Sequence, residues 1–239
     1  MTALSFKNKT VLITGATRGI GAAISLEFHN AGAKVYGTGV HEHATGSFDE
    51  YFKADFSDIE QIRACADFIN QIEPDVLINN AGINKIAPFV DIDIFDFQRI
   101  QQINVLAPLM LCQSAIPSMK RKGWGRIVNI SSIWGKIGKD YRASYSASKF
   151  ALDGLTLTIA AEHASDGILA NCVAPGFTDT ELTHKILGED GISKILSTVP
   201  IRRMANVEEI AKFVVWLGSQ ENSYISGQNI AIDGGFSRV

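Results

Sequence analysis

Short hydrophobic runs recur along the chain and alternate with longer amphipathic segments. The runs are rich in β-branched residues and span residues 10–15, 34–39, 75–80, 126–131, 168–175 and 229–234. Nearly continuous hydrophobicity over such short lengths is typical of strands that are buried on both faces of a parallel sheet. The pattern therefore predicts a strand in each run.

The segments between these runs carry apolar residues at spacings of three and four. Clear examples are residues 19–33, 59–72 and 207–219, and the first contains Gly32, a residue type that often ends a helix. This spacing predicts helices with one buried face. Strands that alternate with helices form a parallel sheet through right-handed crossovers. The sequence thus predicts an α/β fold, with a doubly wound parallel sheet of about seven strands and helices on both faces.

Neither a linker nor an internal repeat divides the chain, so residues 1–239 are expected to form a single domain. Residues 41–50 and 185–194 are polar and contain glycine, which predicts loops. In a doubly wound sheet the ligand binds at the carboxyl ends of the strands. Candidate site residues are therefore those that directly follow a predicted strand.

Composition narrows the class of protein. The chain is 46% hydrophobic and 20% charged, which supports a folded core. Its net charge of −3 argues against the basic surface that nucleic-acid binding needs, so we expect a small-molecule ligand. Because the sequence contains no long apolar segment, we expect a cytoplasmic protein without a membrane partner.

The three cysteines, Cys65, Cys112 and Cys172, lie far apart within apolar segments. This pattern indicates neither a disulfide framework nor a metal cluster. We expect buried free thiols and no bound metal.

A glycine-rich loop, TGATRGIG, follows the first predicted strand and carries Gly15, Gly19 and Gly21. Glycines let backbone N–H groups approach a pyrophosphate, and the N-terminus of the next helix adds partial positive charge. The alternative is a tight strand-to-helix turn that binds nothing. Its position after the first strand of a strand–helix repeat favours a nucleotide.

The glycine spacing G-x-x-x-G-x-G resembles that of the short-chain dehydrogenase/reductase family. Further motifs of that family follow in order along essentially the whole chain: NNAG at 79–82, QQINVLAP with Asn104, NISSIWG with Ser132, YSASK at 145–149 and VAPGFTDT at 173–180. Within the family, the chain is most similar to the 3-oxoacyl-carrier-protein reductase type. The resemblance implies a Rossmann-like fold, a nicotinamide dinucleotide cofactor, and a homotetramer or homodimer.

The end of the second predicted strand bears on which dinucleotide binds. NAD binders usually carry an acid there, whose carboxylate accepts a hydrogen bond from the ribose 2′-OH. Residues 36–40, YGTGV, contain none, which favours NADP(H) while NAD(H) stays possible. Arg18 in the glycine loop is the candidate partner of the 2′-phosphate, the alternative being a solvated loop cation.

The resemblance also implies the other cofactor contacts. Asp55 corresponds to a residue that contacts adenine, but it equally suits the N-cap of a helix that begins near Asp58. In the same way, Thr178 and Thr180 suit either the nicotinamide carboxamide or a helix cap. The expected cofactor-binding residues are Gly15, Thr17, Arg18, Gly19, Ile20, Gly21, Thr38, Asp55, Phe56, Asn80, Ala81, Gly82, Tyr145, Lys149, Pro175, Gly176, Thr178 and Thr180.

Tyr145 and Lys149 lie four residues apart in a segment with helical spacing, so their side chains share one face. Reduction of a ketone by a nicotinamide needs an acid near the carbonyl oxygen. An ammonium beside a phenol lowers the pKa of the phenol, which makes Tyr145 the candidate acid. Two polar residues on a solvated helix face are the alternative, and the glycine loop and Ser132 weigh against it. The resemblance implies that Lys149 also binds the nicotinamide ribose.

Two further polar residues complete the candidate catalytic set. Ser132 follows the predicted strand at 126–131, where its hydroxyl can polarise a substrate carbonyl, and Ser131 is its competitor. The resemblance implies that Asn104 holds a water that links Lys149 to solvent. Alternatively, Asn104 satisfies backbone groups in a helix kink.

The substrate side is implied by resemblance to include Ser132, Trp134, Tyr141 and Phe177. A basic cluster formed by Lys120, Arg121, Lys122 and Arg126 is a candidate contact for an acidic acyl carrier protein. It equally suits a helix C-terminus, where cations complement the dipole. Asp166, at a position that is often basic in the reductase type, argues against carrier docking.

Together these features predict an NADPH-dependent oxidoreductase that reduces a carbonyl to a secondary alcohol. Its substrate would be a 3-oxoacyl thioester or a related ketone. One alternative is a reversible dehydrogenase of a sugar, a polyol or another secondary alcohol. The alternative from another class is a catalytically inactive NAD(P)-sensing protein.

Overall fold

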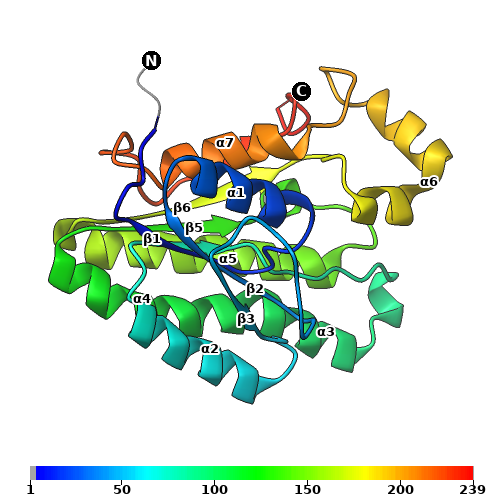
Figure 1. Ribbon diagram of the computed structural model, residues 1–239. Coiled ribbons are helices and arrows are strands. Elements are labelled where there is room, and N and C mark those ends of the chain that lie inside the picture. The colour runs from blue at the N-terminus through cyan, green and yellow to red at the C-terminus, as the bar shows by residue number, and fades with distance from the viewer. Residues whose placement is uncertain (1–3, 239) are drawn as a thin grey trace.

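A seven-stranded parallel sheet forms the centre of the computed structural model, with helices on both of its faces (Figure 1). The structure describes residues 4–238, apart from the side chains of residues 182, 186 and 187. In chain order the strands are β1 (Thr10–Ile13), β2 (Lys34–Gly39), β3 (Glu50–Lys53), β4 (Val76–Asn79), β5 (Gly125–Ile130), β6 (Ile168–Pro175) and β7 (Asn229–Ile232). The predicted doubly wound α/β fold is confirmed.

The strand order is β3-β2-β1-β4-β5-β6-β7, so the direction of winding reverses between β1 and β4. Ligands of doubly wound sheets bind in the crevice outside such a reversal. The glycine loop follows β1, and residues 79–82 end and follow β4. The topology therefore brings two of the predicted cofactor segments side by side.

Alternate residues of β1 enter different hydrophobic clusters. Val11 and Ile13 pack with α1 (Gly19–Asn30) and α7 (Val207–Leu217), whereas Leu12 packs with α2 (Ile59–Ile72) and α4 (Ala107–Lys122). A strand buried on both faces needs apolar residues at every position. This explains the continuous hydrophobic runs in the sequence.

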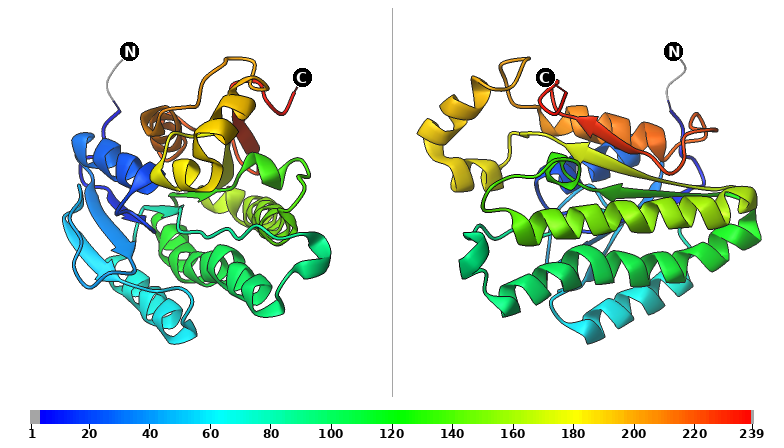
Figure 2. Two further views of the ribbon diagram at one scale, coloured as in Figure 1. Left: turned by 90° about the vertical axis from the view of Figure 1, so that its right-hand side faces the viewer. Right: turned by 180° about the vertical axis from the view of Figure 1, so that it is seen from behind.

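The helices form one layer on each face of the sheet (Figures 1 and 2). α1 and α7 cover one face, and α2, α4 and α5 (Ala143–His163) cover the other. α3 (Ile94–Gln101) continues into α4 through a π-helical turn, η2 (Gln102–Leu106). Three short 3₁₀ turns complete this part of the chain: η1 (Phe89–Asp91), η3 (Ile133–Gly135) and η4 (Ala164–Asp166).

The predicted loop at residues 185–194 is wrong, because this segment lies within α6 (Glu181–Leu196). Gly188, with φ 61° and ψ 176°, has a non-helical backbone, so α6 consists of two helical parts joined by a kink at this residue. The Thr180 side chain caps the start of α6 by accepting from the Thr183 N–H at 3.2 Å. α6 projects beyond the carboxyl edge of the sheet (Figure 2).

The connection between β2 and β3, residues 40–49, contains no helix. The loop predicted at residues 41–50 is therefore confirmed for residues 41–49, whereas Glu50 is the first residue of β3. Parallel strands are usually joined through a helix. Here the Phe48 ring packs over β2, since a Cβ at Gly37 would lie 2.8 Å from it, and it stacks on Tyr51 with ring centroids 5.5 Å apart. One side chain thus fills part of the space that a crossover helix would cover.

None of the helices within residues 4–238 has the length and hydrophobicity needed to cross a bilayer.

Candidate active site

The glycine loop has a backbone that only glycine adopts easily. Gly15 and Gly19 have φ of +65° and +54°, and a Cβ at Gly21 would lie 2.1 Å from the Gly15 carbonyl oxygen. α1 begins at Gly19 without a side-chain cap from Arg18 and without an acid in its first turn. The N–H groups at this end are therefore available to an anionic ligand. The loop fits a dinucleotide pyrophosphate.

We predict that Gly21→Ala weakens dinucleotide binding by about tenfold or more, because the added methyl group forces the loop away from the Gly15 carbonyl. Fluorescence titration with NADPH measures the effect. Gly154→Ala is the matched control, since a Cβ there meets no atom within 4 Å among the described residues of the chain. Unchanged affinity in Gly21→Ala would contradict the assignment of the loop.

Asn80 and Ala81 bind the glycine loop from the end of β4. The Asn80 side-chain amide donates to the carbonyls of Thr14 and Gly15, each at 3.0 Å, and the Thr14 hydroxyl accepts from both backbone N–H groups of residues 80 and 81. Gly82 follows, and a Cβ there would lie 3.3 Å from Asn104 Oδ1 and 3.5 Å from Lys149 Nζ. The loop after β4 thus connects the phosphate end of the site to the catalytic end.

Tyr145 and Lys149 lie in the first two turns of α5, with Lys149 Nζ 5.5 Å from the centre of the Tyr145 ring. Ser132 lies two residues after the end of β5, and its Oγ accepts a hydrogen bond from the Trp134 N–H at 3.2 Å. The tertiary structure brings the three predicted catalytic side chains to one end of the sheet. Ser131, the competitor, is buried and its hydroxyl donates to the Lys149 carbonyl at 3.4 Å.

The pKa of Tyr145 differs from the expectation. Burial raises this pKa above its usual value, and hydrogen bonding by Ser132 and the positive charge of Arg142 offset only part of the increase. The predicted lowering by Lys149 is not found in this structure, because desolvation of the phenol outweighs the nearby charges. Tyr145 is therefore a protonated hydroxyl at neutral pH.

Lys149 is 4% exposed, and its Nζ donates to the Ile130 carbonyl at 2.7 Å. Burial lowers the pKa of Lys149 from 10.5 to about 8. An ammonium has three N–H donors. Two of them remain for a ribose hydroxyl or a water, which is consistent with the predicted role.

Asn104 lies in the π-helical turn η2 and is 1% exposed. Its Oδ1 accepts from the Ile83 N–H at 2.9 Å, and its Nδ2 donates to the Ile83 carbonyl at 2.9 Å and to Ser148 Oγ at 3.0 Å. The Ser148 hydroxyl donates to the Tyr145 carbonyl at 2.7 Å. The side chain thus satisfies backbone groups at a helix irregularity, which was the alternative interpretation. Its role toward a water stays a prediction.

Three aromatic rings pack edge to face beside Ser132. The ring centroids of Trp134 and Phe177 are 6.1 Å apart, those of Trp134 and Phe236 are 5.9 Å apart, and those of Phe177 and Phe236 are 5.2 Å apart. Sequence analysis did not identify Phe236. The sequence feature that could have indicated Phe236 is the preceding Gly234-Gly235 pair, whose φ values of +62° and +90° form a turn that directs the chain back toward the site.

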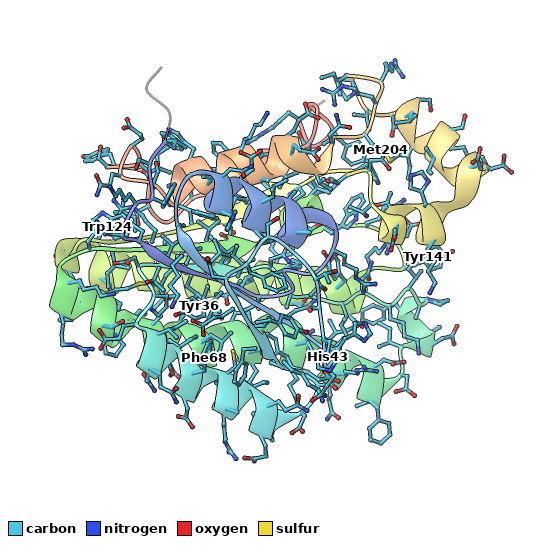
Figure 3. All side chains as sticks on the ribbon, viewed as in Figure 1. Tyr36, His43, Phe68, Trp124, Tyr141 and Met204 are labelled. Carbon is cyan, nitrogen blue, oxygen red and sulfur yellow. The ribbon has the colours of Figure 1, made fainter. Side chains whose placement is uncertain are left out.

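Tyr141 occupies the rim of the site. It is 55% exposed, has φ 62°, and its carbonyl accepts from the Ala87 N–H at 3.2 Å. Figure 3 places Tyr141 at the same end of the molecule as α6. The Thr178 hydroxyl donates to the Gly176 carbonyl at 3.3 Å, so both Thr178 and the capping Thr180 have local structural partners.

At the predicted adenosine end, Asp55 does not cap α2, because Asp58 performs that function by accepting from the Glu60 N–H at 2.9 Å. Asp55 Oδ1 instead accepts from the backbone and hydroxyl of Ser57. Phe56 is 4% exposed and belongs to the hydrophobic core, and Thr38 is buried in β2.

Arg18 is exposed, and no hydrogen bond or ion pair within residues 4–238 involves its side chain. It remains the candidate cation for a 2′-phosphate. The alternative interpretation, a solvated loop cation, predicts the same exposed side chain, and a ligand-binding measurement separates the two.

The proposed basic docking cluster is already paired within the protein. Lys120 contacts Asp166 at 3.0 Å, Arg121 contacts Glu73 at 2.5 Å, and Lys122 contacts Asp75 at 3.5 Å. Arg126 is 5% exposed and donates to backbone carbonyls such as that of Asn222. These residues also precede or begin β5, and Figure 3 shows the neighbouring Trp124 at the opposite end from Tyr141. Arg126 is therefore not available to a partner, whereas Lys120, Arg121 and Lys122 stay partly exposed within their ion pairs, so carrier docking at these three cations stays a prediction.

Cys65, Cys112 and Cys172 are free and buried, as expected. Burial raises the pKa of each thiol to about 12, so none is a reactive thiolate at neutral pH.

Comparisons with known proteins agree with this geometry. A family model described as enoyl-(acyl carrier protein) reductase matches residues 15–237. The 3-oxoacyl-(acyl-carrier-protein) reductase FabG of Salmonella typhimurium is 35% identical over 245 residues, which cover 99% of this chain and all of that protein.

Two solved structures extend the comparison. A candidate NAD(P)-dependent gluconate 5-dehydrogenase from Beutenbergia cavernae, with bound NADP, has a TM-score of 0.92, 33% identity and 98% coverage of each chain. A structure described as a short-chain dehydrogenase/reductase family protein has a TM-score of 0.92 at 33% identity, covering 99% of this chain and 100% of the other. From its motifs, its fold and these matches, the chain belongs to the short-chain dehydrogenase/reductase family of NAD(P)-dependent oxidoreductases.

Proposed function

We propose that the protein is an NADPH-dependent reductase that converts a carbonyl group into a secondary alcohol, with Tyr145 as the general acid. The observation that carries this proposal is the convergence of Ser132, Tyr145 and the buried Lys149 at the carboxyl edge of the sheet. A protonated phenol, a hydroxyl and an ammonium at one end of the sheet support this proposal, because carbonyl reduction needs a proton donor and groups that polarise the carbonyl. The same three residues argue against an inactive sensor.

NADP(H) is the cofactor, as the bound NADP of the Beutenbergia structure supports. The glycine loop would hold its pyrophosphate, Arg18 its 2′-phosphate and Lys149 its nicotinamide ribose. Asp55 and Phe56 would lie near the adenine, and Pro175, Gly176, Thr178 and Thr180 near the carboxamide. When bound, the nicotinamide supplies or accepts the hydride.

The protein groups then act on the carbonyl oxygen. Ser132 Oγ accepts from the Trp134 N–H, and its single O–H, which hydrogen-bonds Tyr145 in this structure, would donate to the carbonyl oxygen of a bound substrate. The Tyr145 hydroxyl gives its proton to the forming alkoxide. Ser132 and Arg142 are the groups that favour the resulting phenolate, and Lys149 would hold the nicotinamide ribose beside it. The Trp134, Phe177 and Phe236 rings would keep water from one side of the site.

For the substrate we propose a 3-oxoacyl thioester or a related ketone, which similarity to FabG supports. An acyl carrier protein that docked on the basic cluster would compete with the ion pairs that these cations make within the protein. Oxidation of a sugar acid or polyol is the second candidate, and similarity to the candidate gluconate 5-dehydrogenase favours it.

We also propose a homo-oligomer. Leu106, Phe150 and Leu157 are apolar, more than a third exposed, and belong to the helical layer of α4 and α5. Exposed apolar residues on one layer are typical of a surface between subunits.

NADPH oxidation across a carbonyl panel tests the function. The panel contains a 3-oxoacyl thioester, the matching free ketone and keto sugar acids, and NADP⁺ reduction is followed with gluconate. Preference for the thioester supports the first candidate, whereas activity restricted to sugar substrates supports the second. NADPH binding without turnover of any compound would leave only the sensor.

We predict that the protein binds NADPH about 10- to 100-fold more tightly than NADH, since a charge-assisted contact to phosphate contributes about 1.5–3 kcal/mol. Arg18→Ala should narrow this ratio by weakening NADPH binding alone. Fluorescence titration with both coenzymes measures it. Arg63→Ala on α2 is the control, because that cation pairs with Glu60 on the surface. Equal affinities in the parent protein would refute NADP(H) selectivity.

A further inference from the structure

The helix-free connection between β2 and β3 leaves two polar side chains of β3 at the coenzyme end of the sheet. Lys53 is the last residue of β3 and pairs in register with Gly39, the last residue of β2. Tyr51 lies two residues earlier, so the two side chains share one face of the strand. Phe48 stacks on the Tyr51 ring and so packs against that face of the strand.

Tyr51 connects this face to the phosphate loop. A Cβ at Gly39 would lie 2.9 Å from Tyr51 Oη and 3.0 Å from Thr17 Cγ2, so the two side chains approach each other across Gly39. Tyr51 Oη also donates to the His41 carbonyl at 2.8 Å, which fixes the start of the connection. The ends of β2 and β3 and the glycine loop therefore meet at one place, next to Arg18.

An ion pair occupies this place. Glu42 Oε2 and Lys53 Nζ are 2.5 Å apart, with side chains 70% and 45% exposed. Hydrogen bonding by Lys53 lowers the pKa of Glu42, so the carboxylate is ionised at neutral pH. Glu42 is the first acid after β2, two residues beyond the YGTGV segment that sequence analysis considered.

We propose that the Glu42–Lys53 ion pair is a second determinant of coenzyme choice. Lys53 provides a cationic contact to the 2′-phosphate of NADP(H), and by pairing with Glu42 it prevents that carboxylate from repelling the phosphate. An ammonium has three donors, so Lys53 can contact Glu42 and a phosphate at once. Without Lys53, the free Glu42 carboxylate would disfavour a 2′-phosphate and suit a ribose 2′-OH. This inference rests on the proposed function.

Direct binding measurements test the pair without relying on turnover. The affinities for NADPH, NADH and 2′,5′-ADP are measured by titration, the last of these as a probe without the nicotinamide. Lys53→Met is expected to weaken the binding of NADPH and of 2′,5′-ADP by about tenfold, and the binding of NADH by less than about twofold. Glu42→Gln is expected to tighten the binding of NADPH by about threefold, because it removes the carboxylate that competes with the phosphate for Lys53.

The Lys34–Glu50 pair provides a matched control. Its atoms are 2.9 Å apart on the same two strands, but Lys34 begins β2 and Glu50 begins β3, away from the coenzyme end. Lys34→Met should leave the three affinities unchanged. Lys53→Arg keeps the charge and should retain at least part of the preference for NADPH.

The outcomes separate this inference from the proposed function. Lys53→Met with parental NADPH affinity, or with equal losses for NADPH and NADH, overturns the role of the pair while the reductase assignment stands. A parent protein that binds neither coenzyme overturns the proposed function itself. If Lys53→Met is poorly folded, Glu42→Gln decides, and unchanged NADPH affinity in Glu42→Gln overturns the inference.

Discussion

Tyr145→Phe is expected to lower the turnover number by about 100- to 10,000-fold while NADPH still binds, because a general acid contributes a factor of that size. The substitution removes only Oη. The phenyl ring keeps its place on α5 beside Lys149 and its packing. Steady-state turnover and NADPH titration on the same preparation measure the two effects separately.

The pH profile provides a second readout for Tyr145. Reduction uses the protonated phenol, and burial raises the pKa of Tyr145, so the acid form persists through neutral pH. Turnover in the parent should therefore be lost only on the alkaline side. Tyr224→Phe is the control, because Tyr224 is 96% exposed. Parental turnover in Tyr145→Phe would remove Tyr145 from the mechanism.

Lys149→Met is expected to lower turnover by at least about 100-fold and at the same time to stabilise the folded protein. Lys149 is 4% exposed with one backbone acceptor, and burial lowers its pKa from 10.5 to about 8. A shift of this size corresponds to about 3 kcal/mol of unfavourable free energy for the charged form. Methionine has a similar length and no charge to bury.

The sign of the pH dependence follows from the lowered pKa. Below about pH 8 the folded protein carries the buried ammonium, so the penalty is fully present. Between about pH 8 and the unfolded value of 10.5 the unfolded chain binds more protons, so stability rises with pH and the penalty disappears. The advantage of Lys149→Met in the free energy of unfolding should therefore be largest at neutral pH and small near pH 10.5.

Chemical denaturation at neutral and alkaline pH measures this advantage. Lys212→Met on the exposed side of α7 is the control and should change stability little. A loss of stability in Lys149→Met at neutral pH would mean that the hydrogen bond to Ile130 outweighs the cost of burial.

The local sequence pattern predicts secondary structure correctly where an element is uniformly buried, and it fails at edge strands and at interrupted helices. β5 was predicted because all of its residues are buried, whereas β3 was not, since this four-residue edge strand is only half-buried and both of its ends are charged. The glycines of residues 185–194 indicated a loop, yet the chain is helical on both sides of the kink at Gly188.

The candidate site divides in the same way. The sequence indicated that Ser132, Tyr145 and Lys149 lie close together, because one strand end and one helix carry them; their catalytic roles stay predictions. Phe236 was not, because it reaches Trp134 and Phe177 from a distant part of the chain. The ion pairs of the basic cluster could not be predicted for the same reason, since its partners Glu73, Asp75 and Asp166 come from other segments.

The sequence by itself determined most of the strands and helices and the glycine loop, and it indicated the candidate catalytic side chains, because burial on both sheet faces and short-range spacing are visible in consecutive residues. Only the tertiary structure decided the protonation of Tyr145 and Lys149, the neutralisation of the basic cluster and the pairing of Glu42 with Lys53. Desolvation and charge pairing depend on which distant segments pack together, and no local pattern contains that information.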